Sequence, residues 1–149
     1  MLSEHPRDFG ADAAEFEAQS PSQVEEFISK NLGPDSRMYA AWDANERMAG
    51  TIGYYRENSA KRVHVREIWG MYVAPTARRC GLGRALIEHV MDDLRQLPGV
   101  LRVNIEVSAG NTGARALYEA TGFEVYGIEP EGLQIGEHLE DTVLMSQRL

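Results

Sequence analysis

One segment limits the fold of this chain more than any other: a turn rich in arginine and glycine that joins an expected strand to an amphipathic helix. The strand ends at Val73, and the helix covers residues 81–97. Its apolar residues recur mostly three or four positions apart, namely Leu82, Ala85, Leu86, Val90, Met91, Leu94 and Leu97. The first N–H groups of a helix are unpaired, and the helix dipole adds positive charge beside them. The segment therefore predicts a binding site for an anion such as phosphate or pyrophosphate.

The side chains of the turn strengthen this prediction. Arg78, Arg79 and Arg84 concentrate positive charge in a chain of 149 residues whose formal net charge is −8. Gly81 and Gly83 allow the backbone to approach an anion closely or to adopt positive φ. The alternative is an ordinary strand–helix turn with surface arginines. Because the chain as a whole is acidic, we expect no nucleic-acid partner.

Two familiar phosphate motifs do not fit the turn. A P-loop requires a Gly-Lys-Ser/Thr ending, which is absent here. A dinucleotide fingerprint requires a small residue where this chain has Leu86. Glu106 does lie where that fold places an acid, but the strands expected before the turn form antiparallel hairpins. Both motifs are therefore disfavoured.

The pattern along the chain predicts an α+β fold in a single domain, residues 1–149. Helices are expected before Gly33, with Asp12 and Ser20 as candidate N-caps. The expected elements after them are the strands Arg37 to Trp42, Met48 to Tyr55 and 63–73, the helix 81–97, the strand 100–107, the helix Thr112 to Ala120, and the strands 123–128 and 139–146. The expected sheet is mixed, mainly antiparallel and flanked by helices.

Composition narrows the class of protein further. Cys80 is the one cysteine, so no intrachain disulfide can form, and the cytoplasm is the expected compartment. No apolar run approaches the ~18 residues of a membrane span. The N-terminus also lacks the basic and apolar regions of a signal peptide. We therefore expect no membrane partner, and we expect no metal.

The turn and a second segment together resemble the GNAT family of N-acetyltransferases, which bind acetyl-CoA. Residues 78–83 read Arg-Arg-Cys-Gly-Leu-Gly and are similar to the family's Arg/Gln-x-x-Gly-x-Gly/Ala signature. Residues 111–123 are similar to its second motif, Asn-x-x-Ala-x-x-Leu-Tyr-x-x-x-Gly-Phe, with Ala114 and Leu117 in place. The resemblance covers about residues 67–126. It implies a GNAT-like sheet and an acetyl-CoA-dependent N-acetyltransferase.

The resemblance also implies which residues bind acetyl-CoA. In the family, the backbone of the strand before the turn pairs with the pantetheine arm, and the amides of the turn hold the pyrophosphate. The corresponding residues of this chain are Met71, Tyr72, Val73, Arg78, Arg79, Cys80, Gly81, Leu82, Gly83, Arg84, Asn111 and Tyr118. For Asn111, a purely structural N-cap is the alternative. A nucleophilic role for Cys80 is disfavoured, because the family transfers the acetyl group directly to the amine.

Direct transfer requires a base for the amine, a donor for the oxyanion and an acid for the leaving thiolate. Tyr118 matches the family's tyrosine near the leaving sulfur and is the predicted general acid, with a core aromatic residue as the alternative. Glu106 and Glu67 are the two candidate bases, unless neither acts and water carries the proton. The resemblance places the oxyanion donor on the backbone near Met71 or Tyr72, where neighbouring strands of the family splay apart.

The acceptor is predicted only as a primary amine of a small molecule, a protein N-terminus or a lysine. The family selects it partly with the loop between the last two strands, here residues 129–138. Glu129, Glu131 and Glu137 make this loop acidic, which suits a cationic amine, although a solvated loop is the simpler explanation. Three aromatic residues either line the acceptor pocket or pack in the core: Tyr54, Tyr55 and Trp69.

The chain departs from the family at its start. No alternating apolar segment precedes Pro6, so the family's first strand is expected to be missing. Unless the native start lies upstream, the strand Arg37 to Trp42 would have an unpaired edge, which a homodimer could cover. The alternative function is a non-catalytic acyl-CoA-binding or regulatory module on the same fold, which would not need Tyr118.

Overall fold

The computed structural model describes Ser20, Ser22, Gly33 and residues 35–149. The elements in chain order are β1 (Arg37–Trp42), β2 (Met48–Tyr55), η1 (Ala60–Arg62), β3 (Val65–Val73), η2 (Pro75–Ala77), α3 (Leu82–Gln96), β4 (Arg102–Ser108), α4 (Thr112–Ala120), β5 (Glu124–Ile135) and β6 (His138–Arg148). The helices predicted before Gly33 and the missing first strand concern residues outside this described part. No helix within it is long and apolar enough to cross a membrane.

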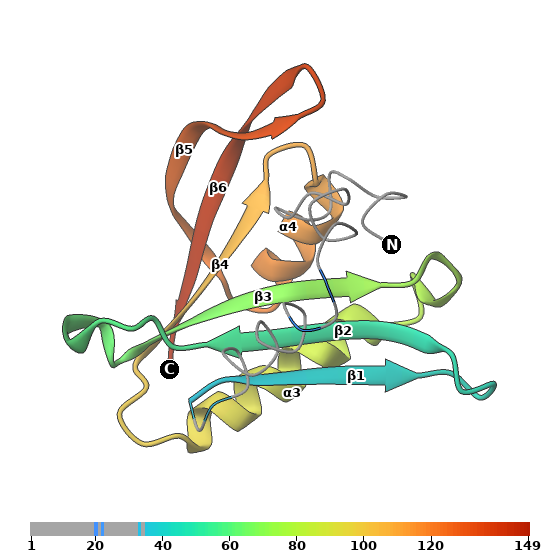
Figure 1. The fold of residues 1–149 in the computed structure, drawn as a ribbon, viewed down its shortest axis with the longest axis horizontal. Helices are drawn as coiled ribbons and strands as arrows, with labels where there is room; N and C mark the ends of the chain where they lie inside the picture. Colours follow the sequence, from blue (N-terminus) through green and yellow to red (C-terminus); the bar gives the residue numbers. More distant parts are fainter. Residues whose placement is uncertain (1–19, 21, 23–32, 34) are drawn as a thin grey trace.

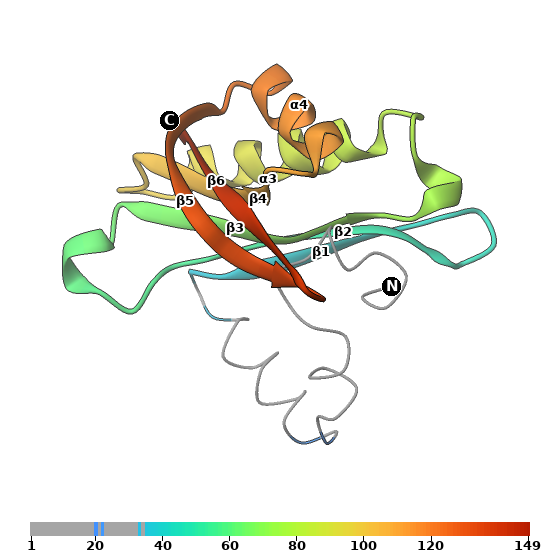
Figure 2. The same ribbon diagram turned by 90° about the horizontal axis from the view of Figure 1, so that it is seen from above.

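The strands of the described residues form one sheet in the order β1-β2-β3-β4-β6-β5. Neighbouring strands are antiparallel except β3 and β4, which run parallel. Both α3 and α4 lie on the same face of this sheet (Figure 2). The mixed, mainly antiparallel α+β fold that the sequence predicts is therefore confirmed.

The two parallel strands stay together for only part of their length. Their register pairs end at Ile68↔Ile105. Beyond this point β3 continues to Val73 and β4 to Ser108, so the strands diverge and open the middle of the sheet (Figure 1). The splay that the family resemblance places beside Met71 is therefore present.

The turn before α3 adopts the backbone conformation that its composition allows. Gly81 has a φ of 85°, and Arg79 also has a positive φ, of 61°. The helix then buries one apolar stripe in the main core, formed by Leu86, Ile87, Val90, Met91 and Leu94. Its observed bounds differ from the predicted 81–97 by one residue at each end.

The bounds of α4 are those that the sequence predicts. The Asn111 side chain caps the helix, because its Oδ1 accepts a hydrogen bond from the Ala114 N–H at 3.1 Å. Gly122 follows the helix with a φ of 97°, a conformation that favours glycine. Tyr118 is buried on this helix, with 4% of its surface exposed.

The C-terminal hairpin is longer than the sequence predicts. A loop is expected over residues 129–138, whereas β5 and β6 remain paired up to the tip of the hairpin. The pairing is irregular between Glu129 and Leu133, where Glu131 has a φ of 53°. Pro130 and Gly132 therefore lie in a bulge within β5, and Gly136 and Glu137 alone form the turn between the two strands.

Candidate active site

A groove of about 940 Å³ follows the opening between β3 and β4. The predicted site residues in its lining are Glu67, Met71, Tyr72, Val73, Arg78, Arg79, Gly81, Gly83, Arg84, Glu106, Asn111 and Tyr118. They come from β3, the turn before α3, α3 itself, β4 and α4. The fold thus brings positions that are distant in sequence to a single cavity.

Two predicted residues do not line the groove. Cys80 is exposed, and its Sγ donates a hydrogen bond to the Ala77 carbonyl at 2.8 Å. Leu82 packs against the hydrophobic core. Because the resemblance assigns the turn a role through its backbone amides, these side-chain positions leave that role untouched.

One end of the groove, the basic end, is formed by Arg78, Arg79 and Arg84 around the start of α3. Arg78 donates from Nε to the Val73 carbonyl at 3.0 Å. Arg84 Nη1 lies 3.4 Å from Glu88 Oε1, one helical turn further along. These contacts hold two guanidinium groups beside the first turn of the helix, where the helix dipole is also positive. The basic end can therefore attract and hold an anionic group.

Gly83 packs closely against side chains of α4 and β3. A Cβ atom at this position would lie 3.0 Å from Leu117 Cδ2 and 3.4 Å from Met71 Cε. A larger side chain would therefore displace residues of both α4 and β3 that line or border the groove.

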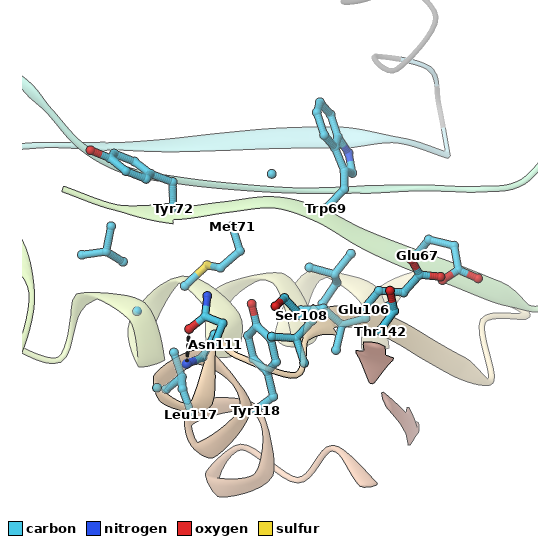
Figure 3. Close-up of a pocket in the computed structure, with 18 of the residues that line it drawn as sticks. Glu67, Trp69, Met71, Tyr72, Glu106, Ser108, Asn111, Leu117, Tyr118 and Thr142 are labelled. Atoms are coloured by element: carbon cyan, nitrogen blue, oxygen red, sulfur yellow. Dashed lines mark hydrogen bonds between the residues drawn. The ribbon is translucent and has the colours of Figure 1, made fainter. Parts of the chain in front are cut away.

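Tyr118 carries a hydroxyl group from α4 into the groove. Its ring is buried and lies 6.2 Å from the Phe123 ring, measured between centroids. Figure 3 shows the hydroxyl pointing away from α4 towards the side on which Met71 lies. The two interpretations of Tyr118, a core aromatic residue and a functional group, are therefore compatible in this structure.

Glu67 lines the groove from β3, but its carboxylate is already engaged. Its Oε1 accepts hydrogen bonds from Arg62 Nη2 at 2.7 Å and from Asn104 Nδ2 at 2.9 Å. Its side chain is 12% exposed. Burial raises the pKa of this carboxyl above its ordinary value, although both hydrogen bonds act in the opposite direction.

Glu106, on β4, is the second candidate base, and its carboxylate is less engaged than that of Glu67. It is exposed, whereas Ile105 and Val107 on either side of it are buried. Its carboxylate makes no hydrogen bond or ion pair with any other described residue. A carboxylate in this state is available to accept a proton from an amine.

Sequence reasoning missed the residues that hold Glu67. Arg62 belongs to η1, and Asn104 lies opposite Glu67 in the parallel register of β3 and β4. Glu57 and Tyr126 also line the groove without having been predicted. No motif marks these residues, and only the strand register could have revealed the pairing of Asn104 with Glu67.

The three aromatic residues that could either line the acceptor pocket or pack in the core take different positions in the structure. Tyr55 and Trp69 line the groove. Tyr54 is fully buried, and its hydroxyl donates to Asp93 Oδ2 at 2.7 Å. Tyr54 therefore belongs to the core and links β2 to α3.

Comparison with known sequences finds acetyltransferases among the relatives of this chain. The sequence model of the Acetyltransferase (GNAT) family matches residues 3–123. The ribosomal protein bS18-alanine N-acetyltransferase of Escherichia coli K12 is 38% identical over 79 residues, which are 53% of this chain and 53% of that protein. The chain thus matches about half the length of this curated relative.

Solved structures show the same fold over most of the chain. A GCN5-related N-acetyltransferase from Kribbella flavida has a TM-score of 0.81 at 26% identity, covering 99% of this chain and 86% of that one. A phosphinothricin acetyltransferase of the GNAT superfamily from Sinorhizobium meliloti, solved in complex with AcCoA, has a TM-score of 0.79 at 22% identity. That match covers 88% of this chain and 70% of the other.

Proposed function

Because the chain belongs to the GNAT family of acetyltransferases, we propose that it transfers the acetyl group of acetyl-CoA directly to a primary amine. Residues 1–149 act as one catalytic domain in this proposal. The observation that carries it is the groove between β3 and β4, because the basic end, Tyr118 and Glu106 all belong to its lining. An anion site, a proton donor and a proton acceptor are the groups that this reaction needs.

The groove fits acetyl-CoA, which supplies the activated acyl thioester. The basic end offers guanidinium groups and the first N–H groups of α3 to a pyrophosphate. Beyond Ile68, β3 has no register partner in β4. Its backbone from Met71 to Val73 can therefore pair with the amide groups of a pantetheine arm, as an added strand would.

The proposed proton transfers assign Glu106 as base and Tyr118 as acid. Glu106 accepts a proton from the acceptor ammonium group, directly or through a water molecule. The freed amine nitrogen forms a bond to the acetyl carbon, and the carbon–sulfur bond breaks with its electron pair on sulfur. Tyr118 then gives its hydroxyl proton to that sulfur, and the second proton that the nitrogen loses as the amide forms restores the hydroxyl through water. Glu67 is the second candidate base, but Arg62 and Asn104 already hold its carboxylate.

A backbone N–H of β3 near Met71 or Tyr72 is the proposed oxyanion donor. These residues line the groove beyond the point where β3 leaves β4. A fixed backbone donor stabilises the negative charge that develops on the acetyl oxygen without the cost of reorganising a flexible side chain.

A protein N-terminus is one proposed acceptor, alongside a small-molecule amine or a lysine. The E. coli relative is named for acetylating an alanine of a ribosomal protein. The match to that relative spans about half of its length. The relative's name therefore guides the choice of test acceptors and does not identify the acceptor of this chain.

The first experiment measures release of free thiol from acetyl-CoA against a panel of amines and N-terminal peptides. Wild type and Tyr118→Phe are compared side by side, because the variant removes only the hydroxyl. We expect turnover with one acceptor class, and a kcat about a hundredfold lower in the variant with little change in the KM for acetyl-CoA. Binding of CoA without turnover on any acceptor would instead favour the acyl-CoA-binding module.

The proposed assembly is a homodimer, and the proposed compartment is the cytoplasm. β1 is the outermost strand of the sheet within the described residues. Met38 and Trp42 on this strand are exposed apolar residues, at 45% and 65%. An outer strand with apolar side chains is a site where a second copy can pair. The single cysteine supports a reducing compartment.

A further inference from the structure

The groove has a second charged end, which we call the acidic end. Its charged and phenolic residues are Tyr55, Glu57, Arg62, Glu67, Glu106 and Tyr126. Figure 3 shows Glu67 and Glu106 on the side of the groove opposite to Tyr72 and Asn111. If the basic end holds the pyrophosphate, as the proposed function requires, the acidic end receives the acceptor amine.

Arg62 binds two of the carboxylates at this end. Its Nε lies 2.6 Å from Glu57 Oε2, and its Nη2 lies 2.7 Å from Glu67 Oε1. Asn104 supports the same arrangement, since its Oδ1 accepts from Arg102 Nε at 2.9 Å while its Nδ2 donates to Glu67. The charges of Glu57 and Glu67 are therefore already directed at a guanidinium group within the chain.

Glu106 is the carboxylate of the acidic end that is left unpaired within the described residues. The two phenols of this end, Tyr55 and Tyr126, add no charge at neutral pH, because the ordinary phenol pKa of 10.0 lies well above neutral pH and burial raises it further. Arg102 lies over the Tyr126 ring, with its Cζ 4.6 Å from the ring centroid. Among the described lining residues of this end, an incoming acceptor thus meets one unpaired carboxylate beside two carboxylates that share the guanidinium group of Arg62.

We propose that Arg62 is a specificity-determining residue that disfavours acceptors with a second positive charge. By pairing with Glu57 and Glu67, it leaves Glu106 alone to receive an ammonium group. Besides Glu106, a second ammonium on the acceptor would find, among the described lining residues, only carboxylates that already contact Arg62, whose guanidinium group opposes its approach. This inference rests on the proposed function, and it adds the expectation that Arg62 lowers activity on diamines and polyamines.

The test compares butylamine with 1,4-diaminobutane, which differ by one ammonium group at similar chain length. The preference for the diamine is the ratio of its kcat/KM to that of the monoamine. Arg62→Gln exposes Glu57 and Glu67, so the ratio should rise about fivefold or more, because each freed carboxylate offers a modest ion pair. Arg62→Lys retains the positive charge and should keep the ratio close to that of wild type.

Arg47→Gln is the matched control. It also removes an arginine from an ion pair, with Asp43, but Arg47 does not line the groove. The ratio should not change in this variant. Thermal denaturation of all variants, with and without CoA, checks folding. The double variant Arg62→Gln with Glu57→Gln should show a smaller rise in the ratio than Arg62→Gln alone, because one of the freed carboxylates is removed.

An unchanged ratio in a folded, active Arg62→Gln protein would overturn the role of Arg62 and leave the proposed function standing. If wild type acetylates no amine at all, the proposed function fails, and binding of both amines in the presence of CoA decides the role of Arg62. Tighter binding of the diamine to Arg62→Gln than to wild type would then support that role. Equal binding, or none, would reject it.

Discussion

Two glutamates of the groove have the same chemistry but different surroundings. Glu67 is 12% exposed and accepts two hydrogen bonds, whereas Glu106 is exposed and free of such contacts among the described residues. The two hydrogen bonds occupy the carboxylate of Glu67, although burial raises its pKa, whereas the carboxylate of Glu106 is open to contact with an acceptor. The surroundings of the two carboxylates therefore favour Glu106 over Glu67 as the base, a choice that the sequence alone left open.

Replacing each glutamate by glutamine tests this separation. Glu106→Gln should lower kcat/KM at neutral pH about a hundredfold, because the variant keeps the shape and removes the base. The defect should shrink as the pH approaches the pKa of the acceptor amine, which then loses its proton without help. Glu67→Gln should retain most of the activity. A larger and pH-dependent loss in Glu67→Gln than in Glu106→Gln would reverse the assignment.

Gly83 is a residue at which a small substitution should act on both binding and packing. In Gly83→Val, the new side chain would meet Leu117 and Met71, whose nearest atoms lie 3.0 Å and 3.4 Å from a Cβ at this position. We expect weaker CoA binding, measured by calorimetry, and a lower Tm without ligand. A lower Tm with unchanged CoA affinity would show that the turn does not hold the pyrophosphate.

At the scale of the elements, Asp93 joins α3 to two strands. Its Oδ2 accepts hydrogen bonds from the hydroxyls of Tyr39 at 2.6 Å and Tyr54 at 2.7 Å, and its Oδ1 accepts from Arg37 Nη1 at 2.8 Å. Burial opposes ionisation of Asp93, but these partners outweigh it and lower its pKa below the ordinary value. The charged form of Asp93 therefore stabilises the packing of α3 on β1 and β2.

Asp93→Asn should lower the free energy of unfolding by about 2 kcal/mol, because hydrogen bonds to a charged acceptor are lost. The pKa of Asp93 is near the ordinary 3.8 in the unfolded chain and lower in the folded protein. Its contribution to the free energy of unfolding is therefore fully present above the unfolded pKa and is lost as the pH falls through the folded pKa. Urea unfolding should thus show a constant difference from wild type above pH ~5, which decreases in stronger acid. Asp92→Asn is the control, since Asp92 is 71% exposed and pairs only with Arg95 among the described residues. Equal effects at both positions would contradict this account.

The elements differ in how well the sequence predicts them, for physical reasons. The bounds of α4 are local, because Asn111 and Gly122 set its ends through their own backbone and side-chain chemistry. The bulge in β5 is not local, since Pro130 and Gly132 favour a turn until β6 pairs on both sides of them. The neutralisation of Glu67 by Arg62 also depends on tertiary structure, so no spacing in the sequence reveals it.

At the scale of the whole molecule, the sequence predicts the mixed sheet and the position of the anion-binding turn. Both depend on periodicity and on motifs within continuous segments, such as residues 78–83. The charge pattern of the acidic end depends instead on β2, β3, β4, β5 and η1 meeting at one place. The acceptor preference is accordingly the property that sequence reasoning leaves most open.

Assembly is a second property of the whole molecule. If copies pair through β1, light scattering at micromolar concentration should give about twice the mass of 16.6 kDa. Trp42→Lys should shift this mass towards that of the monomer, because a lysine on an outer strand opposes pairing with another chain. A monomer mass for wild type would reject the homodimer, and a dimer that tolerates the lysine would place the interface elsewhere.

The early divergence of β3 from β4 leaves a gap in the central ladder of the sheet. Ordinary sheets carry their unpaired peptide groups on the rim, where any other chain can find them. Here such groups line the groove between β3 and β4, in the middle of the sheet. In the proposed function, the pantetheine arm of acetyl-CoA pairs with these groups, so that the ligand takes the place of a strand and completes the ladder. Since recognition of this kind is made by peptide groups, the side chains along the groove can change during evolution while the ligand stays the same.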